Sequence, residues 1–113
     1  MKKFLVLYKA SPELFKQWMS MPPEEQKRGM DIWKKWMADH AKDMADGGGP
    51  VSKVKRVTKD GVSDAHNDIG AYSIVQANSH EEAAAIFKDS PHFDGADSSA
   101  VIDVMAMPEW PKQ

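Results

Sequence analysis

Hydrophobic residues at the start of the chain follow the two-residue period of a β-strand. Residues 3–9 (KFLVLYK) place apolar side chains on both faces of this strand: Phe4, Val6 and Tyr8 on one, Leu5 and Leu7 on the other. A strand that is apolar on both faces is covered on both sides in the folded protein. We therefore expect it to lie in the centre of a sheet whose two faces are both buried.

The pattern then changes to the period of helices in two successive segments. Residues 11–20 (SPELFKQWMS) begin with a serine suited to an N-cap and a proline suited to the first helical position. Residues 22–49 open with PPEE and close with a run of glycines. The apolar stripe of this second segment recurs at Met30, Trp33, Met37, His40 and Met44. It predicts an amphipathic helix of about five to six turns that ends in the glycine run.

Two strand patterns follow the glycines. Residues 51–59 (VSKVKRVTK) alternate polar and apolar positions, which predicts the second strand at an edge of the sheet. An Asp-Gly pair at 60–61 predicts a turn, and residues 69–77 (IGAYSIVQA) predict the third strand. The two strands are expected to form a hairpin with a long loop.

The last third of the chain predicts one more helix and one more strand. Asn78 or Ser79 caps a helical segment that Pro91 ends, and residues 99–110 (SAVIDVMAMPEW) predict the fourth strand, closed by Pro108. The order β, two-piece α, β, β, α, β favours a ferredoxin-like βαββαβ domain of the α+β class spanning residues 1–113. Such a domain has an antiparallel four-stranded sheet in the order 4-1-3-2 with helices on one face.

Helices cover only one face of such a sheet, and the other face also carries apolar side chains. A monomer rarely leaves a large apolar sheet face in water. We expect a second copy of the chain to cover this face, sheet against sheet, in a two-fold homodimer. A monomer with a wet sheet is the alternative.

Composition narrows the possible partners. The net charge is −2 and spread along the chain, so neither nucleic acid nor a membrane surface is expected as a partner. The basic run KVKRVTK (53–59) is interpreted as the solvent face of a strand. The chain contains no cysteine, which excludes disulfides, thiolate catalysis and cysteine-based metal centres. The apolar run after the N-terminal lysines is too short for a secretion signal, so a cytoplasmic protein is expected.

His40 is the first candidate for chemistry, because it interrupts the apolar stripe of the main helix. A neutral imidazole can exchange protons near neutral pH, which makes His40 a candidate general acid or base. The alternative is a structural histidine at the C-terminal end of the helix, where a cation suits the helix dipole.

Asp103 is the second candidate, because it lies beside Val101 and Met105 within an apolar strand. A buried carboxylate needs a partner, and His40 or a lysine could supply it; otherwise this face lines a cavity or an edge. Aromatic residues offer either core packing or the walls of a pocket for a flat ligand. The candidate substrate-binding residues are Trp33, Trp36, Tyr72 and, in the loop SPHFDG (90–95), His92.

The sequence lacks the established cofactor signatures. It has no metal-binding HxH or HExxH spacing, no P-loop, no dinucleotide fingerprint and no nucleophile elbow. We therefore expect no bound metal and no cofactor.

The last two-thirds of the chain resemble the YCII-related (DGPF-type) proteins of the dimeric α+β-barrel superfamily, most specifically over residues 70–108. The resemblance lies in DGGGPV, in GAYSIVQANSHEEAAAIFKDSPHF, which joins a Gly-aromatic strand to an Ala-rich helix ending at Ser-Pro-His, and in SAVIDVMAMPEW. It implies the dimer and a cavity at the helix–sheet boundary of each subunit. Family members are suggested to use a His–Asp pair with its histidine early in the main helix. That region here reads RGMDIW without a histidine, and DGVS replaces DGPF, so the pair is not carried over.

Two functions remain open at this point. The first is a homodimer with one small-molecule pocket in each subunit, and its lining residues are Trp33, Trp36, His40, Tyr72 and Asp103. If this protein is an enzyme, His40 moves the proton. The second is a non-catalytic binding or accessory module. The fold alone does not decide between them, because one fold hosts many activities.

Overall fold

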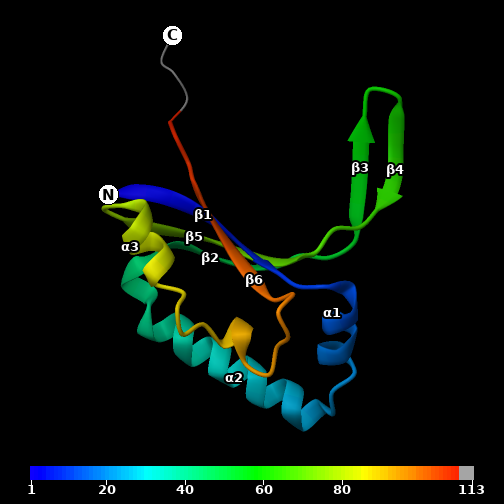
Figure 1. The fold of residues 1–113 in the computed structure, drawn as a ribbon, viewed down its shortest axis with the longest axis horizontal. Coiled ribbons are helices and arrows are strands. Elements are labelled where there is room, and N and C mark those ends of the chain that lie inside the picture. Colours follow the sequence, from blue (N-terminus) through cyan, green and yellow to red (C-terminus); the bar gives the residue numbers. More distant parts are fainter. Residues whose placement is uncertain (110–113) are drawn as a thin grey trace.

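The structure is a computed structural model that describes residues 1–109 (Figure 1). Its elements in chain order are β1 (Lys2–Lys9), α1 (Pro12–Met19), α2 (Pro23–Asp39), the 3-10 helix η1 (Ala41–Asp43), β2 (Met44–Pro50), β3 (Val54–Thr58), β4 (Gly61–Ala65), β5 (Ile69–Ala77), α3 (His80–Ala85), the 3-10 helix η2 (Pro91–Phe93) and β6 (Val101–Ala106). Figure 1 shows a curved sheet with all the helices on one side and a separate hairpin on the other.

The main sheet has four antiparallel strands in the order β2-β5-β1-β6. This confirms the predicted α+β class and the ferredoxin-like sheet with helices on one face. β1 and β5 are the central strands, as their two-sided apolar pattern predicts. The position of a strand in the sheet thus follows from its apolar pattern, because a central strand buries side chains on both faces and an edge strand need not.

The core lies between the sheet and the helices. Phe4, Val6 and Tyr8 of β1 are buried against Trp36 of α2 and Phe87, which follows α3. Burial of side chains of this size stabilises the fold by roughly 1.5–3 kcal/mol each. The buried Tyr8 hydroxyl forms a 2.7 Å hydrogen bond with the Ser73 hydroxyl, and burial raises the pKa of Tyr8. Leu5 and Leu7 point to the opposite, open face of the sheet, where they are half-buried.

The prediction for the end of the main helix is wrong. α2 ends at Asp39, His40 is its C-cap, and the glycine-rich segment Met44–Pro50 forms the edge strand β2. The register shifts between Asp46 and Gly49, which indicates a bulge. Gly48 has φ +69°, and a Cβ atom there would lie 1.9 Å from the Tyr72 carbonyl oxygen. The glycine therefore permits a close approach of two backbones, which strand propensity does not reveal.

The assignment of residues 51–59 to the main sheet is also wrong. Val54–Thr58 pairs only with Gly61–Ala65, and these two strands form a separate two-stranded sheet. The predicted Asp-Gly turn is confirmed, since it joins the two strands and Gly61 has φ +140°. The predicted second strand thus pairs with part of the predicted long loop and not with the third strand.

The C-terminal part follows the prediction with shorter elements. Ser79 caps α3, its hydroxyl accepting a hydrogen bond from the Glu82 amide at 3.1 Å. The helix is only six residues long, and residues 86–89 continue it as turns, in which the amides of residues 86–88 donate to carbonyls three residues back. β6 ends at Ala106, and Trp110, the last residue of the predicted fourth strand, lies outside the described residues.

Candidate functional site

The sheet separates the residues that the sequence proposes for one pocket. Trp33, Trp36 and His40 come from α2 and its C-cap, on the helix side. Tyr72 and Asp103 are each paired with Leu7 across β1, so they share its face, which is the open one. One subunit therefore does not bring His40 and Asp103 together, and the predicted pocket lined by all five residues is not formed.

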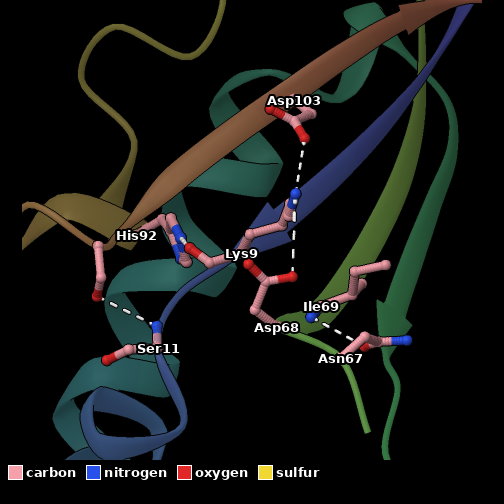
Figure 2. Close-up of polar contacts among 8 residues, drawn as sticks. Lys9, Ser11, Asn67, Asp68, Ile69, His92 and Asp103 are labelled. Carbon is pink, nitrogen blue, oxygen red and sulfur yellow. Dashed lines mark hydrogen bonds and ion pairs between the residues drawn. The ribbon is translucent and has the colours of Figure 1, made fainter.

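Asp103 has a lysine as its partner. The Lys9 Nζ lies 3.1 Å from Asp103 Oδ2 and 3.9 Å from Asp68 Oδ1 (Figure 2). The hydrogen bond from Lys9 to Asp103, and the negative charges of Asp103 and Asp68, raise the pKa of Lys9. This network joins β1, β6 and the loop before β5 on the open face.

His40 lies at the C-terminal end of α2, where the structural alternative places it. Its ring packs on the Trp36 indole with centroids 4.3 Å apart. Its Nδ1 lies 3.5 Å from Asp43 Oδ2 in η1, and both side chains are about three-quarters buried, at 25% and 29% exposure. Trp36 is buried, and its Nε1 has no hydrogen-bond partner within residues 1–109. His40 thus belongs to a small local His–Asp pair.

His92 is the most deeply buried histidine of the described chain, at 5% exposure. Its Nε2 lies 2.8 Å from the Lys9 carbonyl oxygen (Figure 2), and a carbonyl only accepts, so Nε2 carries the proton. Burial lowers the pKa of His92, while the Lys9 and Val101 carbonyls act in the opposite direction. The edges of Tyr8 and Trp18 meet its ring, with centroids 5.7 and 5.6 Å apart.

His92 and Trp33 line a cavity of about 610 Å³ between α1, α2 and η2. We call it the helix cleft. Its walls include large apolar side chains: Trp18, Met19, Met21, Met30 and Ile32. Its charged lining residues are Glu25, Arg28 and Asp94.

The corner between α1 and α2 gives the helix cleft its shape. The first helix ends before the proline pair at 22–23, which starts the next helix in a new direction. The Gln26 Nε2 donates to the Met19 carbonyl at 3.0 Å and to the Met21 carbonyl at 2.8 Å, and these bonds tie the corner to α2.

Sequence reasoning missed most of the helix cleft. Met30 lies on the predicted apolar stripe, yet it is 59% exposed, because the sheet contacts only the later turns of α2. Met19 is also exposed. A usable signal was Gly29, since a glycine inside a helix often leaves space for a neighbour.

A second cavity, of about 460 Å³, lies on the open face. Leu5, Leu7, Ile69 and Tyr72 form its floor, and Lys53 and Lys55 belong to its hairpin side. We call it the face groove. Neither cavity is lined by His40 or Asp103.

Residues 1–109 contain no cluster of three or more His, Cys, Asp or Glu side chains placed to hold a metal ion. In the same part of the chain, no helix combines the length and apolar character that crossing a membrane requires.

The structure is similar to that of the 5-chloro-2-hydroxyhydroquinone dehydrochlorinase (TftG) of Burkholderia phenoliruptrix AC1100, solved in complex with 2,5-dihydroxybenzoquinone. The TM-score is 0.54 at 15% sequence identity, over 98% of this chain and 95% of that one. The two proteins share a fold. At this identity the likeness extends to the fold alone. No protein-family model matches the chain, and no curated protein matches it in sequence.

Proposed function

We propose that this protein is a small-molecule-binding homodimer that takes a flat, largely apolar ligand in the helix cleft of each subunit. The observation that carries this proposal is the cleft itself: its volume of about 610 Å³ is within the range of ligand sites. It exposes Met19, Met30 and Ile32 at 81%, 59% and 44%. Large apolar side chains gathered at a concave, exposed site favour ligand binding.

The side chains of the cleft favour a ring that bears oxygen substituents. Trp18 and Trp33 offer indole faces and edges for stacking on an aromatic ring. The Arg28 guanidinium supplies donors for a phenolate, carboxylate or carbonyl oxygen. The fold neighbour was solved with an oxygenated six-membered ring, which motivates the same class of probe here.

We also propose that the chain is a YCII-related protein. The motifs of residues 70–108 and the shared fold with TftG support this assignment. The homodimer belongs to the same proposal, because the open face of the sheet carries Leu5, Leu7 and Ile74, which are only half-buried in one chain.

Acid–base catalysis is a second candidate function, favoured by the pair of His40 and Asp43. If Nδ1 donates to the carboxylate, the Nε2 atom of His40 is left free to accept a proton. This pair comes from different positions than the family's pair, and it requires a ligand next to the C-terminal end of α2. The non-catalytic binding module remains the function that the geometry supports best.

Gly29 offers a direct test of the helix cleft. Nothing lies within 4 Å of a Cβ atom built at this position, which lines the cleft. Gly29→Phe should therefore fold, fill the cleft and weaken binding of 2,5-dihydroxybenzoquinone or benzoate by about tenfold or more, the equivalent of about 1.4 kcal/mol. Isothermal titration calorimetry measures this change.

Gly29→Ala is the matched control, since it adds one methyl group and should leave the affinity nearly unchanged. Equal affinity in the Phe variant and the wild type would place the ligand elsewhere. A wild type that binds neither probe, nor other hydroxylated rings, would argue against the proposed ligand class.

The catalytic candidate requires a separate measurement. This candidate places the probe beside the C-terminal end of α2 and not in the helix cleft. His40→Gln should then abolish any consumption of the probe above the buffer rate while thermal stability stays nearly unchanged. A large loss of stability would instead show that His40 is structural, as a cap that packs on Trp36.

A further inference from the structure

The hairpin of β3 and β4 projects from the domain. We call residues 54–65 the arm. Neither of its strands joins the four-stranded sheet, and Figure 1 shows the arm on the side opposite the helices. Only Val54 and Ala65, at its base, are half-buried, and the rest of the arm is exposed. A lone two-stranded hairpin is marginally stable in water, so this arm needs support from outside its own subunit.

The dimensions of the chain agree with this description. The radius of gyration is 15.8 Å. A compact domain of this length would have a value of about 13 Å. The subunit is therefore less compact than a globular domain of this length, in keeping with an arm that projects from it.

The arm carries an apolar pair that has no cover. Val57 and Val62 lie directly opposite one another and are 75% and 67% exposed. The face groove, with Leu7, Ile69 and Tyr72, lies at the base of the same arm. Val57 is three residues beyond Val54, about 10 Å along a stiff paired strand, so the valines cannot fold back onto their own groove.

We propose that the arm crosses onto the open sheet face of a second copy of this chain, where Val57 and Val62 pack against the partner's face groove. A projecting apolar pair and an apolar groove on one chain can meet between two copies. A two-fold axis makes the contact reciprocal, with each arm on the other subunit's sheet. The proposal rests on the proposed homodimer and adds the segment that fastens it.

The charges of the arm fit an identical partner better than a polyanion. Lys55 and Asp64 pair with one another across the two strands. The other cations of the arm, Arg56 and Lys59, are partly offset by Asp60 at the turn. A nucleic acid or an anionic membrane would require a patch of one sign, which this balance does not provide.

The absence of cysteine makes the contact directly measurable. Val62→Cys, labelled with a benzophenone maleimide and irradiated, should yield a covalent dimer cross-linked to β1, β5 or β6. Mixing isotope-labelled and unlabelled chains shows that the bond joins two subunits. Lys34→Cys, exposed on α2, is the matched control and should give no covalent dimer.

Two results distinguish failure of the arm proposal from failure of the proposed homodimer. If the wild type sediments as a monomer, the homodimer fails and the arm's partner fails with it. If the wild type is a dimer but Val62→Cys yields no cross-link between subunits, the arm proposal alone is overturned.

Charge substitution gives a second, independent measurement. Val57→Asp combined with Val62→Asp should raise the dimer dissociation constant about tenfold or more, because it places carboxylates in an apolar contact. Ser63→Asp, on the other face of the arm, is the control and should leave the constant nearly unchanged. Circular dichroism verifies the fold, and an unchanged constant in the folded double variant would overturn the proposal.

Discussion

At the scale of single residues, the face on which a side chain lies decides what it can do. Asp103 and His40 were both recognisable from sequence as polar residues within apolar patterns. Their partners were not, because the strand register and the exact end of a helix select them. Lys9 reaches Asp103 since both lie at neighbouring positions of β1 and β6. His40 meets Asp43 since the chain turns at the end of α2.

His92 should make stability depend on pH. Burial lowers its pKa from the ordinary 6.5, so the unfolded chain binds more protons than the folded one between the two values. The contribution of His92 to the free energy of unfolding is then fully present above about pH 6.5, and it falls as the pH drops toward the folded pKa. His92→Gln should flatten this dependence, as measured by urea unfolding at a series of pH values.

Removal of an exposed histidine serves as the comparison for His92. His66 lies exposed in the loop after β4. The variant His66→Gln should keep the wild-type slope of unfolding free energy against pH below pH 6.5. If both variants retain that slope, groups other than His92 cause the acid sensitivity.

At the scale of elements, hydrophobic period predicted the central strands, and serine caps predicted the starts of α1 and α3. The start of α2 has no such cap, because Pro22 stands at the N-cap position. The edge strand β2 could not be found in this way, because a glycine-rich segment has low strand propensity and is typical of the end of a helix. Its backbone reaches within contact of the Tyr72 carbonyl, and this long-range packing has no local signature. The arm was missed for a related reason. Alternating polar and apolar residues predict a strand, but they do not determine which other strand it pairs with.

Two neighbouring glycines of β2 test this interpretation. Gly48→Ala should destabilise the protein by about 3 kcal/mol, from a positive φ and a clash with backbone. Gly49→Ala should change the free energy of unfolding by less than about 0.5 kcal/mol, because nothing lies within 4 Å of its built Cβ atom. Denaturant unfolding compares the two, and equal effects would contradict the bulge at Gly48.

Helix α2 carries a further element-scale prediction. Gly29→Ala should raise the free energy of unfolding by about 0.5–1 kcal/mol, since the position is helical and the added methyl group meets no neighbour. Thermal or denaturant unfolding measures the gain. A destabilised variant would show that the helix is distorted at this residue.

At the scale of the whole molecule, the sheet has helices on one face and apolar side chains on both. The βαββαβ order predicted this arrangement, and the structure confirms it for one chain. The sequence predicted only Trp33 and His92 of the helix cleft as ligand-binding residues, because the cleft arises where two helices meet at a corner. The second copy stays a prediction that both the open face and the arm require.

Sedimentation equilibrium at micromolar concentration tests the central claim most directly. The chain has a mass of 12.6 kDa, and we expect a particle of twice this mass whose dissociation constant rises with Leu7→Asp on the open face. Lys34→Asp, on the solvent side of α2, should leave the mass unchanged. A particle of 12.6 kDa at that concentration would contradict the claim that a second copy covers the open face of the sheet, and the arm proposal depends on that claim.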